Sequence, residues 1–396
     1  MPNESISSVG ITPERVSSVR ITPDNQTVLN DLGLLADLAG TWSGEGFNLI
    51  ARPDFEGKAN LYLQLNQTRE TLQIDPIGSS IPNRGFGQND IELFGLTYLQ
   101  KISELSQGGA MHIEPGIWIT QPVTTYPPEA PPDAEAQIIA RMGTIPHGNS
   151  LLAQGIASRF SGPPTLKTPT GGCAFSSFPS FNSTPFATLP TAPPVINAAG
   201  SSEDATAKAT GVPPFDEYNL TVPDSAANPR TPFGTSLPPL PPNINGVPMQ
   251  DVINDPITLL QQVINQQVAQ GCTFAGTVLN IATQAKITFF QNPNSKAGDP
   301  TVVVGPANGA GGIENILFLE GGEPGGAVGP NADTALVYAT FWIEKVTPKG
   351  STASFVQLQY AQMVILNFEI LGILPAKHVT LGWPHISVAT LRKPFA

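Results

Sequence analysis

Four histidines, His112, His147, His378 and His385, occur in the 396-residue chain, and imidazole is the side chain best suited to act as a base or metal ligand near neutral pH. His385 opens an alternating segment, residues 385–392, in which its side chain shares one face with Ser387, Ala389 and Leu391. A small, mostly apolar face around one imidazole suits an axial haem ligand. A structural histidine at a strand start fits the same spacing.

His112 and Glu114 lie two residues apart and share one face of a predicted strand. At this spacing the carboxylate can orient the imidazole, or both can coordinate a metal, although such pairs are also common as structural contacts. Together with Arg84 they suggest a metal- or acid/base-dependent isomerase or dehydratase. His147 is expected in a turn at a pocket rim, and His378, next to Lys377, in a solvated loop.

Several familiar catalytic motifs are missing from the sequence. It contains no Gly-x-Ser-x-Gly, His-Glu-x-x-His or Cys-x-x-Cys, and its glycine-rich stretch, 305–329, lacks the Lys-Ser/Thr ending of a phosphate loop. Cys173 and Cys272 are expected to be buried thiols, with a single disulfide as the alternative.

The charge of the chain argues against polyanionic partners. The net charge is -12, with 19 basic residues that nowhere cluster, which disfavours nucleic acid and anionic membrane surfaces. No apolar run is long enough to predict a membrane span, and the N-terminal residues do not follow the pattern of a secretory signal. We therefore expect a cytoplasmic protein.

The elements that position these residues are predicted to be strands. The 38 glycines and 41 prolines indicate many turns, and residues 40–50 alternate as a strand does. Leu61, Leu63 and Leu65 share a face, whereas Leu72 and Ile74 have the other parity, as a β-bulge would cause. Further strands are predicted at 91–103, 110–120, 137–144, 150–158, 273–284, 285–290, 335–346, 355–368 and 385–391.

The organisation is predicted to be a polar, extended arm at 1–33 followed by one all-β domain at 34–396. Its strands lie at about 36–160 and 270–396, on either side of a Pro-rich insertion at about 161–254. A helix is expected at 255–270, with Asp255 as its cap and Pro256 at its first position, covering a barrel end.

Trp42 near the first strand and Arg392 on the last indicate how this domain closes. A guanidinium stacked on the indole would make these strands neighbours and place Gly44, Glu45 and His385 around one cavity. The predicted fold is an antiparallel, up-and-down β-barrel of the calycin or lipocalin type.

Three short segments stand out: residues 40–46 (Gly-Thr-Trp-Ser-Gly-Glu-Gly), residues 112–116 (His-Ile-Glu-Pro-Gly), and His385 followed by Leu391 and Arg392. In type and order they resemble the corresponding segments of nitrobindin-like haem-binding β-barrels. The resemblance implies a ten-stranded barrel that holds b-type haem, with His385 as the iron ligand and His112 in the pocket. It also implies chemistry on nitric oxide, peroxynitrite or peroxide. The long insertion and the chain length depart from the family. The predicted cofactor-binding residues are His385, Trp42, Gly44, His112, Ser387 and Ala389.

Other functions remain open at this stage. One is a haem-free carrier of a hydrophobic small molecule, whose cavity would be lined by side chains such as Leu61, Leu63, Phe341 and Leu358. The isomerase or dehydratase with His112, Glu114 and Arg84 is another, so enzymatic activity is left undecided. Docking through the Pro-rich segment and a homodimer are also left open.

Overall fold

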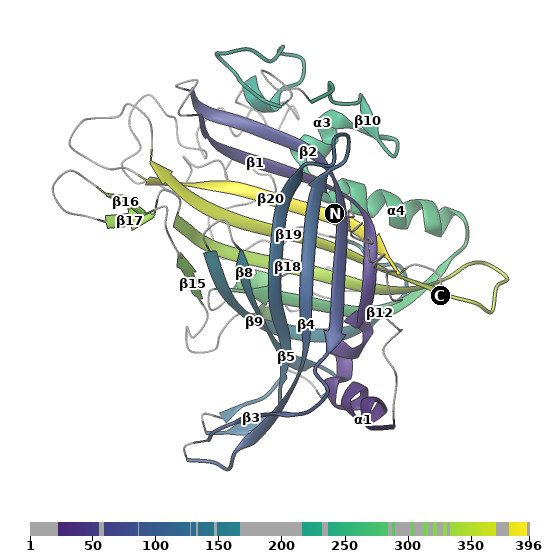
Figure 1. The fold of residues 1–396 in the computed structure, drawn as a ribbon. Helices are drawn as coiled ribbons and strands as arrows, with labels where there is room; N and C mark the ends of the chain where they lie inside the picture. The colour runs from purple at the N-terminus through teal and green to yellow at the C-terminus, as the bar shows by residue number, and fades with distance from the viewer. Residues whose placement is uncertain are drawn as a thin grey trace, which may run out of the picture.

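Ten long strands form one closed, antiparallel barrel in the computed structural model (Figure 1). The structure describes residues 23–54, 59–85, 87–126, 128–131, 134–145, 149–166, 216–231, 237–283, 287–289, 302–304, 312–315, 320–322, 328–330, 333–369 and 380–393. The barrel strands are β1 (Gly40–Asp54), β2 (Ala59–Pro76), β4 (Ile91–Glu104), β5 (Ala110–Gln121), β8 (Gln137–Ile145), β9 (Asn149–Ser161), β12 (Thr273–Ala282), β18 (Asp333–Thr347), β19 (Phe355–Glu369) and β20 (Thr380–Arg392).

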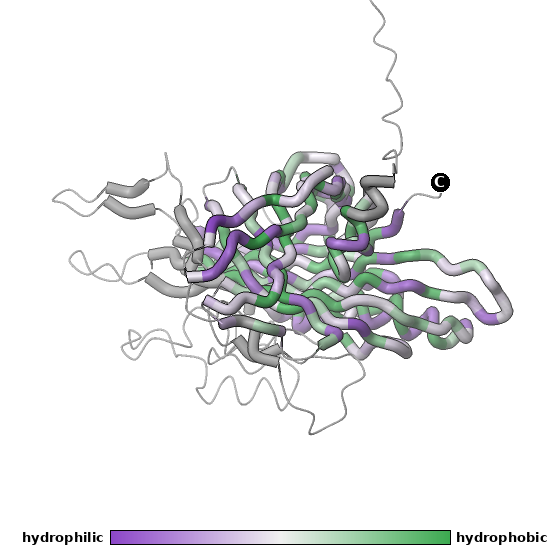
Figure 2. Tube along the Cα trace, turned by 90° about the horizontal axis from the view of Figure 1, so that it is seen from below, coloured by the Kyte–Doolittle hydropathy of each residue, from purple (hydrophilic) through white to green (hydrophobic). Residues whose placement is uncertain are grey.

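Each barrel strand pairs with the next barrel strand along the chain, and β20 pairs with β1 to close the ring. The prediction of an all-β, up-and-down antiparallel barrel is therefore confirmed. Hydrophobic and hydrophilic residues alternate over short intervals along these strands (Figure 2), as expected where the two faces of a strand meet different surroundings.

Shorter elements decorate the barrel. β3 (Ile81–Asn83) pairs with β4, and β15 (Gly312–Asn315) with β9. Four small hairpins are β6 (Thr124–Thr125) with β7 (Pro128–Glu129), β10 (Asn243–Ile244) with β11 (Val247–Pro248), β13 (Ile287–Phe289) with β14 (Val302–Val304), and β16 (Glu320–Gly322) with β17 (Val328–Pro330). The helices are α1 (Pro23–Leu32), η1 (Gly33–Leu38), η3 (Asp216–Tyr218), α3 (Met249–Asn254) and α4 (Ile257–Ala269). None of the described helices is both long and apolar enough to cross a membrane.

One buried cluster, the inner cluster, fills the barrel and includes Trp42, Leu72, Trp118, Phe341 and Leu391. Helix α1 and η1 add apolar side chains to it, and the Trp42 indole donates a 2.8 Å hydrogen bond to the Leu38 carbonyl. The expectation of an extended arm at 1–33 is therefore wrong for residues 23–32, which form a helix because its apolar side chains find a place in the core. Residues 1–22 lie outside the described part of the chain.

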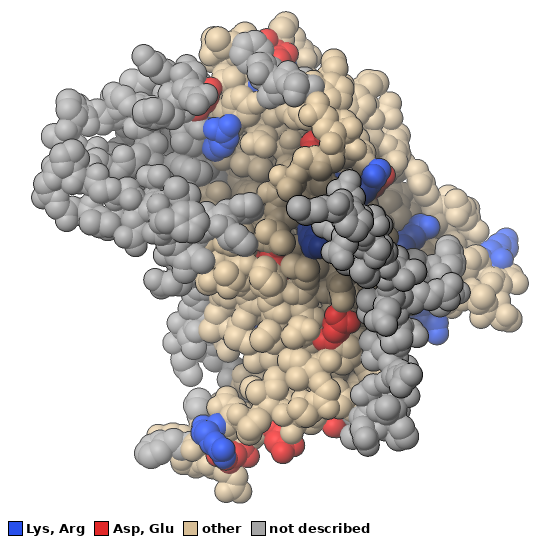
Figure 3. All heavy atoms as spheres, viewed as in Figure 1, with Lys and Arg blue, Asp and Glu red and all other residues tan. Residues whose placement is uncertain are grey.

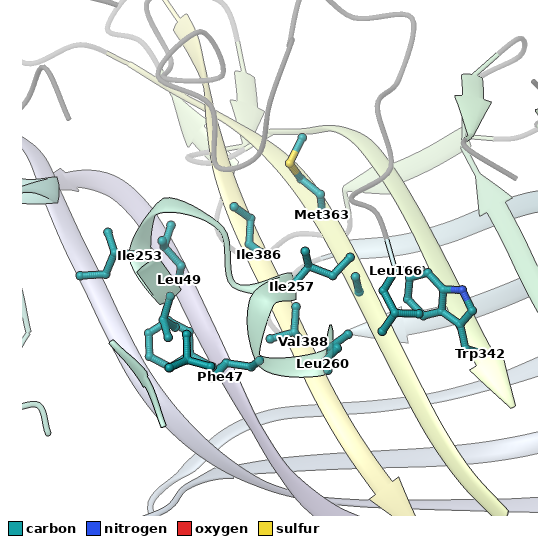
Figure 4. Close-up of a cluster of buried hydrophobic side chains, with 14 of the residues drawn as sticks. Phe47, Leu49, Leu166, Ile253, Ile257, Leu260, Trp342, Met363, Ile386 and Val388 are labelled. Atoms are coloured by element: carbon teal, nitrogen blue, oxygen red, sulfur yellow. The ribbon is translucent and has the colours of Figure 1, made fainter. Parts of the chain in front are cut away.

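A second cluster, the outer cluster, lies on the outside of the barrel wall beneath α3 and α4 (Figure 4). Ile253, Ile257 and Leu260 of these helices pack against Phe47 of β1 and Val388 of β20. Asp255 accepts a 3.2 Å hydrogen bond from the Ile257 amide, in keeping with its predicted role as a helix cap. The predicted position over a barrel end is wrong, because the apolar face of α4 covers the wall.

Strand β2 changes its buried face without a bulge. Its pairing with β1 is unbroken from Gly40 opposite Ile74 to Arg52 opposite Tyr62. Leu63 and its neighbours of the same parity belong to the outer cluster, whereas Leu72 belongs to the inner one. The predicted bulge between Leu65 and Leu72 is wrong, because different faces are covered at the two ends of this strand.

Strands β1 and β20 are neighbours as predicted, but the cation that packs on the Trp42 ring is a different one. β1 pairs with β20, with Ser43 opposite Arg392. Arg392 has the parity of the outward-facing Val388 and lies 4.9 Å from the centre of the Phe355 ring. Lys393 lies 4.5 Å from the centre of the Trp42 ring instead. The predicted Trp42 to Arg392 stacking is wrong because the two side chains are on opposite faces.

A described segment of the Pro-rich insertion, residues 229–231, forms hydrogen bonds with the edge of β2. The Leu63 amide donates to the Pro229 carbonyl at 3.1 Å, and the Thr231 amide donates to the Leu63 carbonyl at 2.9 Å. On the surface seen in Figure 3, charged side chains are few and scattered over the described part.

Candidate functional site

A cavity of about 300 Å³ lies inside the barrel, beyond the inner cluster as seen from Trp42. Its β1 wall is formed by Asn48, Ile50 and Arg52, farther along the strand whose start holds Trp42. This volume is at the lower end of the range for small-molecule pockets. The other lining residues are Gln64, Gln100, Ile102, Met111, His112, Ile145, Asn149, Leu151, Val337, Tyr360, Gln362, Val364, Leu366, His385 and Ser387.

His385 forms part of the cavity wall. Strand pairing places it between Ile50 of β1 and Val364 of β19, two apolar residues that line the same cavity. Ser387, two residues on, lies between Asn48 and Gln362 in the same way. The imidazole therefore has apolar neighbours on both adjacent strands and amide side chains one row deeper.

Asn48 contributes an acceptor that lacks a protein donor. The residue is only 3% exposed, and its Oδ1 atom has no hydrogen-bond partner among the described residues. A buried acceptor without a donor costs about 1–3 kcal/mol. A bound molecule or water that donates to Asn48 would relieve that cost.

His112 lines the same cavity and contacts the carboxylate of a buried ion pair. Its Nε2 atom lies 3.3 Å from Oε2 of Glu114, whose Oε1 accepts a 2.6 Å hydrogen bond from Arg141. Arg141 also donates to the Tyr98 hydroxyl at 3.0 Å and to the Gln362 amide oxygen at 2.8 Å. The Tyr98 hydroxyl donates to Glu114. Glu114 and Arg141 are fully enclosed, so this pair is shielded from solvent.

Glu114 is ionised at any physiological pH. Burial alone would raise the pKa of Glu114, but the charge of Arg141 and the hydrogen bonds from His112 and Tyr98 outweigh it and lower the pKa to about 2. An ionised carboxylate at Nε2 favours the imidazole tautomer that carries its proton there. Nδ1 of His112 is then left as the acceptor.

A second buried carboxyl, Glu70, behaves in the opposite way. It accepts hydrogen bonds from the Tyr360 hydroxyl at 2.6 Å, from Thr68 at 3.2 Å and from Gln100 at 3.4 Å. Burial raises the pKa of Glu70 to about 7, since these hydrogen bonds offset only part of the desolvation. Tyr360 and Gln100 line the cavity, so a group that exchanges a proton near neutral pH lies directly behind its wall. We call Glu70, Tyr98, Gln100, His112, Glu114, Arg141, Tyr360 and Gln362 the polar layer.

The arginine that contacts Glu114 beside His112 is Arg141, whereas the predicted Arg84 lies elsewhere. The Arg84 side chain is 81% exposed and pairs with Asp90 before β4, away from the residues that line the cavity. Arg141 occupies the central inward position of β8, between Ile139 and Gly143. A lone charge at the inward position of an otherwise apolar strand was the available sequence signal.

Other predicted site residues are separated from the cavity. Trp42, Gly44 and Ala389 lie on the inner face but do not line the cavity, and Glu45 is exposed on the outer face. Leu61 and Leu63 belong to the outer cluster, so they do not line the cavity as expected for a carrier. Phe341 and Leu358 lie in the inner cluster. His147, His378 and Cys173 fall outside the described residues, and Cys272 is a half-buried free thiol.

The fold and site define a closed, antiparallel β-barrel with an interior cavity and a buried polar layer. Within the described residues, no group of three or more His, Cys, Asp or Glu side chains could hold a metal ion. No protein-family model and no curated protein matches the chain. The chain is similar to the crystal structure of Rv2717c from M. tuberculosis, with 8% identity and a TM-score of 0.30 over 94% of this chain and 99% of that chain. At that identity and score, the similarity carries no argument about function.

Proposed function

We propose that the chain binds b-type haem in the barrel cavity, with His385 as the axial ligand. The observation that carries the proposal is the position of His385 in the cavity wall between Ile50 and Val364. A haem ligand must stay neutral, and apolar neighbours favour the neutral imidazole.

The chain around the cavity fits a flat, largely apolar group in two respects. An apolar wall is formed by Val337 on β18 and by Val364 and Leu366 on β19, the two barrel strands that precede β20 in the chain. Ser387 lies one row below His385, and its hydroxyl group can donate a hydrogen bond to a carboxylate of a bound group. A bound haem would supply an iron centre for reactions with nitric oxide, peroxynitrite or peroxide. The residues of this chain would hold it, exclude water and present His112 with a fixed tautomer.

The test is a titration of the purified protein with haemin, followed in the ultraviolet-visible spectrum. We expect a Soret band with wild-type protein, its loss in His385→Ala, and its retention in the matched variant His112→Ala. Circular dichroism checks that both variants fold. A wild-type protein without a Soret band, or a band that His385→Ala leaves unchanged, would contradict the proposal. A different apolar molecule found by mass spectrometry in haem-free protein would favour a carrier instead.

A second candidate, acid/base catalysis on a small molecule in the same cavity, is favoured by the contacts of His112. Its Nε2 atom faces a buried, ionised carboxylate that Arg141 fixes in place, an arrangement that prepares Nδ1 to take a proton. Proton exchange from small enolisable ketones into deuterated water measures this capacity. We expect exchange that His112→Ala abolishes and Arg84→Ala leaves unchanged. Equal exchange in all three proteins would exclude this function.

A further inference from the structure

A second hollow adjoins the cavity on the outer face of β2, β4 and β5. This hollow, which we call the side groove, has a volume of about 460 Å³. Three residues, Ile102, Met111 and His112, line both the side groove and the interior cavity. The two spaces therefore share these three residues along their common boundary.

The pairing between β4 and β5 is irregular at this boundary. Ile102 pairs with His112, but the next residue, Ser103, pairs with Ala110, so Met111 is an extra residue without a partner. Such a bulge bends the strand and disrupts the ladder locally. The inward-facing His112 consequently reaches the side groove as well as the cavity.

The charge of the side groove is positive in a chain with a net charge of -12. The charged residues that line it are Arg69 and Lys101, and both are exposed. Neither forms an ion pair with a described residue, and Glu104 nearby is engaged by Ser106 and the Gln107 amide in its own turn.

The two cations are also close to each other. Arg69 pairs with Ser103 and Lys101 with Thr71, which makes Arg69 and Lys101 diagonal neighbours on the same face of β2 and β4. Like charges at this spacing repel, and an anion placed between them would remove that cost.

We propose that the side groove binds the carboxylate of an amphipathic acid whose apolar body passes Ile102 and Met111 into the cavity. The inference deepens the proposed function, since haem is itself an apolar ring with carboxylates, and it rests on the cavity being a ligand site. It does not require iron. The cations determine which ligands are preferred, and the cavity accommodates the apolar part.

The test compares lauric acid with its uncharged methyl ester by titration calorimetry on the full chain. The variant Arg69→Ala/Lys101→Ala is matched by Lys345→Ala/Lys349→Ala, which removes two exposed cations elsewhere and changes the net charge equally. We expect the first variant to bind the acid about tenfold more weakly, because two exposed charge pairs with the carboxylate are lost. The ester should bind both variants and the wild type equally. Inorganic phosphate added as a competitor should displace the acid only weakly, because it lacks an apolar body.

The outcomes separate this inference from the haem proposal. Unchanged acid affinity in Arg69→Ala/Lys101→Ala, or an equal loss for the ester, overturns the carboxylate site whatever haemin does. Strong displacement of the acid by phosphate also overturns it, in favour of a simple anion site. A normal acid preference in a protein that shows no Soret band supports the side groove and contradicts the haem proposal.

Discussion

The inner and outer clusters are both buried, but their surroundings differ. The outer cluster is almost wholly apolar, and its buried carboxyl, Glu344, is held by Gln357, which in turn bonds to Gln267 of α4. The barrel interior combines an apolar cluster with an ion pair, two carboxyls whose pKa values are shifted in opposite directions, and a cavity. The comparison indicates that the outer cluster stabilises the wall, whereas the interior has polar groups and a cavity in place of continuous apolar packing.

The largest effect should come from breaking the interior ion pair. Arg141→Met leaves the ionised Glu114 buried without its partner, which costs about 3–5 kcal/mol of the free energy of unfolding. Urea unfolding followed by tryptophan fluorescence measures the loss. The double variant Arg141→Met/Glu114→Gln should recover part of it, because the charge is then gone. A single variant within about 1 kcal/mol of wild type would show that the pair is not buried in solution.

A cavity in the outer cluster should destabilise the protein without touching ligand binding. Leu260→Ala removes a fully buried side chain of α4 and should cost about 3 kcal/mol. Val268→Ala on the same helix, where the side chain is exposed, should change stability by less than about 0.5 kcal/mol. Lauric acid affinity should be the same in both variants. A weakened affinity in Leu260→Ala alone would contradict the division between the two regions.

The smallest effect, and the most dependent on pH, is expected at Glu344. Burial raises the pKa of Glu344 to about 8, and the hydrogen bond from Gln357 offsets only part of this. Between about pH 4.5 and pH 8 the unfolded chain ionises this group while the folded chain keeps it neutral, so stability falls with rising pH. Glu344→Gln should reduce that fall, leaving the part that comes from Glu70, and should be more stable than wild type at pH 9 by on the order of 2 kcal/mol. Urea unfolding at pH 5 and pH 9 checks it, and an unchanged pH dependence would disprove it.

The sequence was sufficient to predict the barrel and most of its strands, because alternation and turn residues are local signals. It was also sufficient to predict that β1 and β20 are neighbours. Alternation does not say which face points inward when helices cover the outside. For that reason Leu61 and Leu63 were assigned to the cavity, and the change of face in β2 was interpreted as a bulge.

The site was predicted less completely than the fold. His112 and Glu114 were found from their spacing, and the structure brings them together with His385 around the cavity or directly behind its wall. Arg141 was missed because its partner Glu114 is 27 residues away, so only the three-dimensional pairing of β5 with β8 brings the two together. The position of α4 depended on tertiary packing in the same way.

The seam between β9 and β12 has a kinetic consequence. β9 ends at Ser161 and β12 starts at Thr273, so the entire Pro-rich insertion must be spanned before these two strands can pair. The free-energy cost of closing a loop grows only with the logarithm of its length, by about 0.6 kcal/mol per doubling. Even an insertion of this length therefore destabilises the folded state little. Pairing between strands distant in sequence is slow, however. We expect the two halves of the barrel to form first and to join late, at this seam and at the pairing of β1 with β20, so that their joining is the rate-limiting step of folding.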